Sequence, residues 1–328
     1  MSTELRWGIL STAHIGRALI RGIGQSDGGC VQGVASREWT RANEWAKEHG
    51  IPRAFGAYDD MLASHEIDAI YNPLPNSMHA EWTIRALEAG FPVLCEKPLT
   101  VDAAQARKVL QAAKRARLPV AEAFMYRFHP MYDHMLELIA AGAIGDVVAI
   151  RSSFTFRLTD RANIRCSTEL AGGALMDVGC YCVNLSRRIA GCEPARAQAF
   201  ERRTSVDDTL IGALEFPNGI LAQFECSIEN AGRSWAEIAG TDGLIRIPKP
   251  WFPGEEQAEF IVRRGDHEET IFTPGANTYR LEVEDFANAL RTHQPPRWPA
   301  EDAVANMAVI DALYASAKQG ASIAVEQA

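Results

Sequence analysis

Strand-like and helix-like stretches alternate without interruption over the first 123 residues, and this alternation restricts the possible folds more than any other feature. Short apolar runs predict strands at 5–10, 31–35, 53–55, 67–71, 93–95 and 119–123. Amphipathic stretches between them predict helices ending near Gly24, Gly50, Gly90 and Arg117. Such a chain forms a parallel sheet with helices on both faces. We therefore expect a doubly wound α/β domain over residues 1–123, with Thr40 and Ser77 capping two of its helices.

The pattern changes after Ala123. A helix is expected at 131–141, a long strand at 146–156, and a helix from Gly172-Gly173 to about Ile189. Strand-like runs separated by turns then continue to Phe272, and two helices follow near 278–292 and 301–318. Grouped strands and grouped helices are typical of an α+β fold. The sequence thus predicts a second domain over residues 124–328 with a mainly antiparallel sheet.

Composition excludes several classes of function. The net charge is −9, from 33 basic and 42 acidic residues, and no basic block stands out. We therefore expect neither a nucleic-acid nor a membrane partner. The seven cysteines are scattered and contain no C-x-x-C pair, which argues against a disulfide framework and a thiolate zinc site. No H-x-x-E-H or H-x-H grouping is present, so no metal is expected, and a reduced cytoplasmic protein is the default.

The turn after the first predicted strand has the position of a dinucleotide-binding fingerprint, G-x-G-x-x-G. It reads Ser11, Thr12, Ala13, His14, Ile15, Gly16, so only the third glycine is present. Serine and alanine are small enough for backbone N–H groups to approach a pyrophosphate at the start of a helix. A plain strand-to-helix turn is the alternative.

Residues after the second predicted strand favour NADP over NAD. An NAD site usually has Asp or Glu here for the ribose 2′-hydroxyl, whereas an NADP site has arginine. The chain has Ser36-Arg37-Glu38, with Arg41 one turn later, and these could hold a 2′-phosphate. Solvated surface arginines are the alternative, and Glu38 leaves NAD open.

Glu96 and Lys97 follow the apolar run Val93–Cys95 and precede Pro98. Ligands of open α/β sheets bind beyond the carboxyl ends of the strands, where this pair would lie. Charged groups at such a place are costly unless they are paired or used. Lys97 is therefore a candidate active-site residue, with a surface turn as the alternative.

Together these elements resemble the glucose–fructose oxidoreductase / inositol dehydrogenase / MocA family over essentially the full length. The motifs that carry the resemblance are Trp7–Ala13, Asn76–His79, Glu96–Pro98, Met125–Pro130 and Gly172–Tyr181. The branch most similar in these motifs contains the NADP-dependent dimeric dihydrodiol dehydrogenases and the aldose 1-dehydrogenases. The resemblance implies a Rossmann domain followed by a substrate-binding and dimerisation domain.

The resemblance also implies roles for single residues. Lys97 matches the active-site lysine, Pro98 a proline that is often cis, and Arg127 an arginine near the nicotinamide amide. Asn76 and His79 match positions that line the nicotinamide, and Asp177 and Tyr181 match the family's Asp and its acid/base residue. We also expect cofactor contacts from Tyr58, Pro73, Leu74 and Glu96.

These residue types suit the oxidation of an alcohol, in which the protein moves a proton while the nicotinamide takes the hydride. Asp177 and Tyr181 are four apart on a predicted helix and share one face. Tyr181 is expected to be the acid/base, with Lys97 tuning its pKa and Asp177 binding a second hydroxyl. Both helix residues could instead belong to a plain core.

The sequence therefore predicts an NADP-dependent oxidoreductase acting on a vicinal diol or the anomeric hydroxyl of an aldose. Reduction of a dicarbonyl or anhydro-sugar ketone and a non-catalytic NADP- or sugar-binding regulator stay open. Arg157, Arg161 and Arg165 could meet an acidic substrate group or be solvated loop residues.

An antiparallel sheet with helices on one face leaves its other face to be covered. A homodimer, or a dimer of dimers, is expected through that face. The side chains expected on it are Phe154, Phe156, Phe224, Trp235 and Ile238.

Overall fold

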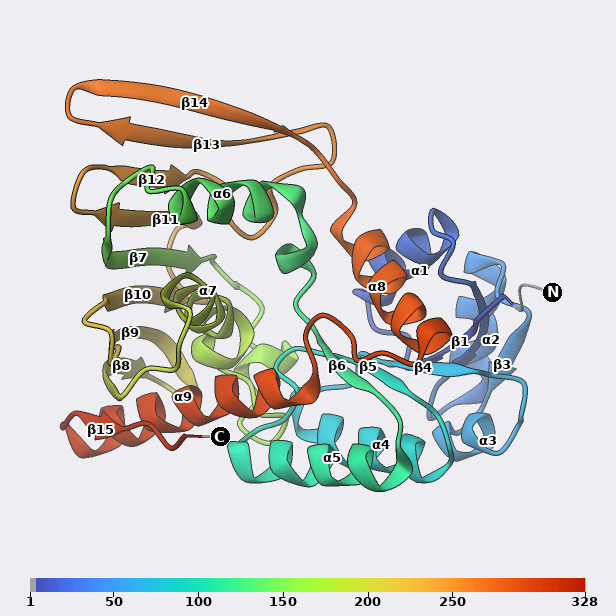
Figure 1. Ribbon diagram of the computed structural model, residues 1–328. Helices are drawn as coiled ribbons and strands as arrows, with labels where there is room; N and C mark the ends of the chain where they lie inside the picture. Colours follow the sequence, from blue (N-terminus) through green and yellow to red (C-terminus); the bar gives the residue numbers. More distant parts are fainter. Residues whose placement is uncertain (1–3, 328) are drawn as a thin grey trace. The chain divides into compact units, whose positions relative to one another are not determined.

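A computed structural model describes residues 4–327 of the chain. The chain divides into two compact units (Figure 1). The first unit contains the residues up to Met125 together with Asn277–Val304, and the second contains Tyr126–Ala276 and the residues from Ala305 onward. The first crossing lies two residues from the boundary expected from sequence, whereas 277–304, expected in the second domain, pack with the first unit.

The first unit is built on a parallel sheet in the strand order β3-β2-β1-β4-β5-β6, and the doubly wound fold expected from sequence is confirmed. Its elements are β1 Arg6–Leu10, α1 Gly16–Gly24, β2 Cys30–Ala35, α2 Trp39–His49, β3 Arg53–Phe55, α3 Tyr58–Leu62, β4 Ala69–Asn72, α4 Asn76–Glu88, β5 Val93–Glu96, α5 Ala103–Ala116, β6 Val120–Ala123 and α8 Thr278–Thr292. The strand order reverses between β1 and β4, where dinucleotides bind in such sheets.

Each face of this sheet has its own apolar core, with α1, α2 and α8 on one side and α3, α4 and α5 on the other (Figure 1). Helix α8 packs on α1 so closely that a Cβ at Gly22 would lie 2.9 Å from the backbone of Tyr279. Val283 and Phe286 of α8 join the core around Trp7. The segment that returns from the end of the chain thus completes the first unit.

Two helix starts differ from the expected ones. Helix α2 begins at Trp39, so Thr40 lies inside its first turn, and α4 begins at Asn76 after Pro75, so Ser77 is also inside its helix. Neither helix has a side-chain cap, whereas Asp102 accepts the Gln105 N–H at 2.7 Å before α5. Serine and threonine favour caps but also occur within the first turn, and sequence alone places helix ends only to within one or two residues.

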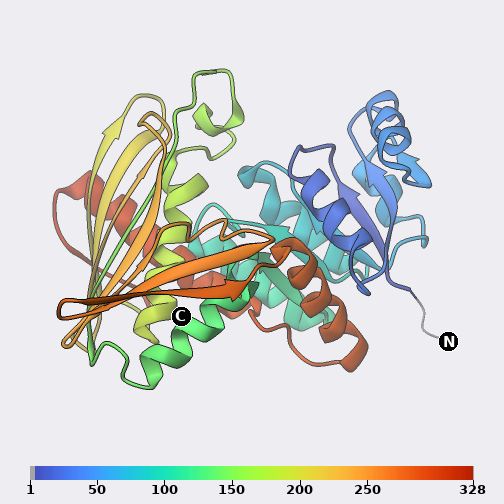
Figure 2. The same cartoon turned by 90° about the horizontal axis from the view of Figure 1, so that it is seen from above.

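The second unit contains a mainly antiparallel sheet, as expected, with its yellow and orange strands drawn in Figure 2. Across the described residues the strand order is β14-β13-β12-β11-β7-β10-β9-β8-β15, with the strands labelled in Figure 1. Only the β7–β10 pair within it is parallel. Its elements are the 3₁₀ turn η1 Met125–Phe128, α6 Pro130–Ala140, β7 Val147–Thr155, the 3₁₀ turn η2 Ile164–Cys166, the π-helical turn η3 Leu175–Gly179, α7 Cys180–Ala190, β8 Arg196–Arg203, β9 Asp207–Glu215, β10 Leu221–Ser227, β11 Arg233–Gly240, β12 Leu244–Ile247, β13 Gln257–Arg264, β14 His267–Pro274 and β15 Ile323–Ala324. The last long helix, α9 Ala300–Gln319, starts in the first unit and continues in the second.

Side chains alternate between a buried and an exposed face of this sheet, and the expected dimer face is partly wrong. Phe224 and Ile238 are buried on the covered side, where α7 packs against β7 and β10. Phe154 stacks on Trp251, and Phe156 lies just beyond β7. Of the five residues expected, Trp235 is an exposed one. The other exposed large apolar side chains on the open face are Phe200, Ile211, Leu221 and Phe272.

Candidate functional site

The turn after β1 has a backbone that normally needs glycine. Ser11 has φ +121°, in the region that favours glycine, at the position of the first fingerprint glycine. Its hydroxyl accepts the Ala13 N–H at 3.2 Å and donates to the Pro73 carbonyl at 3.4 Å, which ties this turn to the end of β4. Helix α1 has no side-chain cap at its start. The small residues and the uncapped helix start fit a pyrophosphate.

The end of β2 presents two arginines beside Tyr58. Arg37 and Arg41 are exposed, and Ser36 is buried with its N–H bonded to the Phe55 carbonyl at 3.1 Å. Burial raises the pKa of Tyr58, while the charges of the two arginines act to lower it, so the three side chains lie close enough to interact. Two guanidinium groups at this place suit a 2′-phosphate.

The end of β4 is held by a buried asparagine that sequence reasoning missed. Asn72 donates to the His79 carbonyl at 3.2 Å and the Thr83 hydroxyl at 3.1 Å, and it accepts the Leu74 N–H at 3.3 Å. This side chain fixes the Pro73–Leu74 segment, which leads to Asn76 at the start of α4. An Asn-Pro pair at a strand end was the signal that could have revealed it.

His79 is a positioning residue in this structure. The ring is 1% exposed, with Nε2 at 2.6 Å from the Leu74 carbonyl and Nδ1 at 2.8 Å from the Pro98 carbonyl. Burial lowers the pKa of His79 to about 4, so the ring is neutral near pH 7 and one of the two nitrogens carries the proton. Because both partners are carbonyl oxygens, the neutral ring donates one hydrogen bond, and its other nitrogen lies in contact with the second carbonyl, between the loops after β4 and β5.

The Glu96-Lys97-Pro98 motif lies at the carboxyl end of β5, with a cis peptide bond between Lys97 and Pro98. Tyr71 donates to one oxygen of Glu96 at 2.6 Å, and the Lys97 N–H donates to the other at 3.3 Å. Lys97 is half-buried. Within the first unit the structure therefore connects Ser11, Pro73, His79 and the Lys97 motif along one edge of the sheet. Tyr71, which sequence reasoning did not identify, holds the Glu96 carboxylate through this hydrogen bond.

In the second unit, Asp177 and Tyr181 lie on one continuous helical segment, made of the π-helical turn η3 and α7. The expected helix starts later than Gly172-Gly173, at Leu175. The Asp177 carboxylate pairs with Arg165 at 2.6 Å and its side chain is 14% exposed. Arg127 is buried and also belongs to this unit, where its carbonyl accepts from Arg188.

Tyr181 is enclosed by aromatic rings. Its ring centroid lies 5.7 Å from Tyr126, 5.5 Å from Phe154 and 5.7 Å from Trp251, and Tyr181 is 6% exposed. Phe252 is exposed and contacts Phe154 at 6.3 Å. Aromatic faces of this kind pack well against the C–H surface of a sugar or alicyclic ring.

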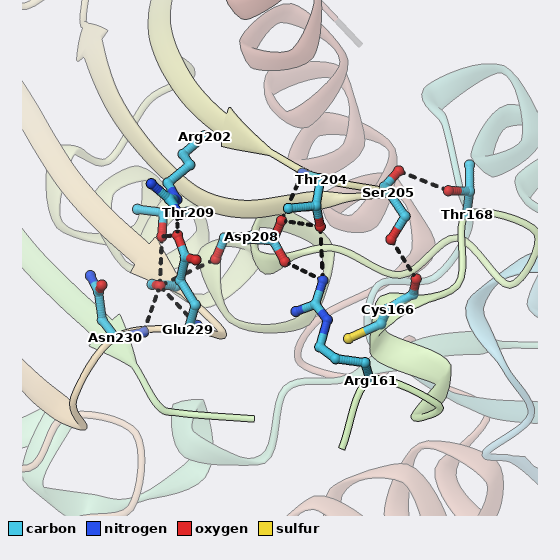
Figure 3. Close-up of polar contacts among 11 residues, drawn as sticks. Arg161, Cys166, Thr168, Arg202, Thr204, Ser205, Asp208, Thr209, Glu229 and Asn230 are labelled. Carbon is cyan, nitrogen blue, oxygen red and sulfur yellow. Dashed lines mark hydrogen bonds and ion pairs between the residues drawn. The ribbon is translucent and has the colours of Figure 1, made fainter. Parts of the chain in front are cut away.

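The loop after β7 is fastened to the turn before β9 by a polar network, shown in Figure 3. Arg161 donates to Thr204 at 2.8 Å and to Asp208 at 2.7 Å. Thr168 donates to the Ser205 carbonyl at 2.9 Å. Arg161 and Arg165 therefore already have carboxylate partners within the chain, and both Arg157 and Arg161 line an open cavity of about 430 Å³.

Residues 4–327 lack the features of two further classes of site. No group of three or more His, Cys, Asp or Glu side chains there is arranged to hold a metal ion. Nor does any helix of that stretch combine the length and apolarity needed to cross a bilayer. Burial raises the pKa of Cys182 to about 12, so this thiol is not a nucleophile near neutral pH.

Both units of the chain are similar in sequence to known oxidoreductases. The family model of the NAD-binding Rossmann oxidoreductases matches residues 5–124, and that of the GFO/IDH/MocA C-terminal domain matches residues 132–246. D-xylose 1-dehydrogenase (NADP(+)) 2 of Haloferax volcanii is 38% identical over 98% of this chain and 100% of its own length. The trans-1,2-dihydrobenzene-1,2-diol dehydrogenase of Bos taurus is 33% identical over 82% of this chain and 81% of its own.

A solved 3-ketoreductase from Actinomadura kijaniata, in complex with NADP and TDP-benzene, superposes with a TM-score of 0.91 at 28% identity, covering 96% of this chain and 98% of that one. The agreement covers both units, and the motifs around Lys97 and Tyr181 lie within the matched regions. The chain therefore belongs to the GFO/IDH/MocA family of oxidoreductases.

Proposed function

We propose that this protein is an NADP-dependent dehydrogenase that oxidises the anomeric hydroxyl of an aldose or one hydroxyl of a vicinal diol. The observation that carries the proposal is Tyr181, a nearly buried phenol among three aromatic rings and one helical turn from Asp177. The relationship to a xylose 1-dehydrogenase over the full length of both chains supports it.

The proposed cofactor residues lie at the sheet edge of the first unit, apart from Arg127, which belongs to the second unit. The Ser11–Gly16 turn would receive the pyrophosphate, with Thr12, Ala13, His14 and Ile15 supplying backbone around it. Ser36, Arg37, Arg41 and Tyr58 would hold the 2′-phosphate end. Pro73, Leu74, Asn76, His79, Glu96 and Arg127 would define the nicotinamide end. When bound, the nicotinamide supplies the hydride chemistry, and the protein orients the substrate and moves the proton.

The proton transfer is assigned to Tyr181. Tyr181 would accept the substrate hydroxyl proton as general base, and Lys97 is proposed as a second catalytic group. Glu96 holds the Lys97 backbone N–H and is itself held by Tyr71, which orients the lysine. Asp177, which pairs with Arg165 at 2.6 Å, would accept a hydrogen bond from a second substrate hydroxyl.

A substrate panel with both cofactors tests this function. Aldoses and cyclic vicinal diols should give an absorbance rise at 340 nm, with a larger kcat/KM for NADP than for NAD. Replacing Tyr181 by Phe, or Lys97 by Met, should lower kcat roughly a hundredfold or more. Tyr132→Phe is the matched control, because the Tyr132 hydroxyl donates to the Pro250 carbonyl within the second unit. Wild-type kcat in both site variants would overturn the assignment.

A reductase acting on a sugar ketone is the second candidate. It is favoured by the dTDP-3,4-didehydro-2,6-dideoxy-α-D-glucose 3-reductase of Actinomadura kijaniata, 30% identical over 88% of both chains. Oxidation of NADPH by dicarbonyl or keto-sugar substrates, without oxidation of aldoses or diols, would support it. NADPH binding without turnover in either direction would instead indicate a regulator.

We also propose that a second copy of this chain covers the open face of the second sheet. Phe200, Ile211, Leu221 and Phe272 are each more than half exposed there, which is unusual for a surface left to water. Sedimentation should give twice the chain mass of 36.0 kDa, or four times it. Ile211→Glu should release monomer, while the control Val148→Glu, exposed but pointing to the other face, should not. The free cysteines support a cytoplasmic location.

A further inference from the structure

A buried carboxylate holds the start of the helix that carries Asp177 and Tyr181. Asp207, the first residue of β9, is 1% exposed. Its Oδ2 accepts the Leu175 N–H at 2.7 Å, and its Oδ1 accepts the Tyr314 hydroxyl at 3.0 Å. Leu175 begins the π-helical turn η3, so the contact caps this helix from a neighbouring strand.

The chain entering the helix leaves no room for a side chain at either of its two glycines. Gly173 has φ +119°, and a Cβ there would lie 2.0 Å from Asp207 Oδ1. A Cβ at Gly172 would lie 2.3 Å from the Arg165 carbonyl oxygen. The Asp177 N–H then donates to the Gly173 carbonyl at 3.0 Å. Asp207 is thus connected to Asp177 by four residues of tightly confined backbone.

The adjacent residue, Asp208, has a different role. It lies in the network of Figure 3, where it accepts from Arg161 at 2.7 Å and from the Thr204 hydroxyl at 2.6 Å. Asp208 therefore fastens the loop after β7, whereas Asp207 faces the helix start. Two neighbouring carboxylates of the same strand provide a matched pair for experiment.

We propose that Asp207, with its carboxylate ionised, is a positioning residue. It fixes the rotation of the η3–α7 helix about its axis and its position along that axis, and so places the side chains of Asp177 and Tyr181. The inference rests on the proposed function, because it assigns Asp207 to the same proton-transfer site. Asp207 acts through the backbone from Gly173 to Asp177 and does not touch the substrate.

The groups around Asp207 set its pKa within the pH range in which enzyme activity can be measured. Burial raises the pKa of Asp207 to about 6, while the Leu175 N–H, the Tyr314 hydroxyl and the Arg203 charge act to lower it. Cys226 of β10 also faces it, and burial keeps that thiol neutral. Because an N–H cannot accept, an added proton must reside on Oδ1, and the Tyr314 hydroxyl must then turn from donor to acceptor. Protonation also removes the negative charge at the helix start.

The test compares Asp207→Asn with Asp208→Asn across pH 5–9. Wild-type kcat should fall below an apparent pKa of about 6. Asp207→Asn mimics the protonated acid, so its kcat should not show this fall at low pH. At pH 8 its kcat should be about fivefold or more below the wild-type value, because a small misplacement of a reacting group lowers the rate. The Kd for NADPH should stay unchanged. Tyr314→Phe removes a donor to the ionised form and should move the acid limb to higher pH.

A second readout does not depend on turnover. The Leu175 amide resonance of the full-length protein should titrate near pH 6 in the wild type and in Asp208→Asn, and should not titrate in Asp207→Asn. An Asp207→Asn enzyme with wild-type kcat at pH 8, or a Leu175 amide that titrates the same way without the carboxylate, would overturn the inference. Lack of turnover on every aldose and diol would overturn the proposed function, while the amide titration would still decide whether Asp207 controls the helix start.

Discussion

Replacing Asp207 by Asn should make the protein more stable at pH 8 and leave its stability nearly unchanged at pH 4. The carboxylate is buried, and burial raises its pKa from the usual 3.8 to about 6. A raised pKa means that the folded state binds more protons than the unfolded state between these two values. Folding stability contributed by this group therefore falls as the pH rises from 3.8 to 6, and the full cost is present above 6.

The size of this cost follows from the shift. A change of about two pKa units corresponds to about 3 kcal/mol of differential stability. Asparagine retains an oxygen for the Leu175 N–H and an amide for the Tyr314 oxygen, and the hydrogen bonds to the ionised carboxylate are already included in the pKa of about 6. The net gain for Asp207→Asn at pH 8 should therefore be about 3 kcal/mol.

Urea unfolding of the wild type and the variant at half-unit steps from pH 4 to 8 measures this difference. Other titrating groups cancel in the subtraction, because they are present in both proteins. The difference in unfolding free energy should grow between pH 4 and 6 and then stay level. Two parallel curves, or a variant that becomes less stable as the pH rises, would refute the reasoning. A gain in stability together with a loss of kcat would show that the buried charge is retained for activity.

Three further predictions concern the edge of the first sheet. Ser11→Gly should be about 1 kcal/mol more stable than Ser11→Ala in thermal unfolding, because both lose the hydroxyl but only glycine relieves φ +121°; equal stabilities would contradict this. The pKa of His79, lowered to about 4, makes its stability contribution complete above 6.5 and lost as the pH falls toward 4. His79→Gln should therefore flatten the decline of wild-type stability between pH 6.5 and 4, and an unchanged slope would count against a neutral buried ring. Tyr71→Phe removes the donor to Glu96 and should lower kcat without changing the NADP Kd, measured by stopped-flow and fluorescence; a loss of cofactor affinity alone would assign Tyr71 to binding.

Local patterns predicted most of the first unit. Apolar runs predicted the strands, and glycines predicted where the helices end. The bounds expected for the third strand, Arg53–Phe55, are those of β3. The spacing of Asp177 and Tyr181 likewise placed both on one helical segment. The motif around Lys97 was recognisable because two charged residues follow a buried strand.

What the sequence did not reveal depends on contacts between distant residues. Nothing local marks Tyr71 as the partner of Glu96, or Asp207 as the acceptor of Leu175, because each pair is separated by more than 20 residues. Alternation along a strand defines two faces but not which of them a helix will cover, so Phe224 and Ile238 were assigned to the wrong one. The helix α8 carries no sign of the unit with which it packs.

That helix has a consequence for how the protein is made. A ribosome completes the six strands of the nucleotide-binding unit long before it reaches Val283 and Phe286, which supply part of the core around Trp7. Until then the outer surface of α1 at Gly22 has no covering backbone. The nascent nucleotide-binding unit therefore stays incomplete while some 150 residues of the other unit are synthesised. A fragment truncated after Met125 should accordingly be recovered as an aggregation-prone intermediate.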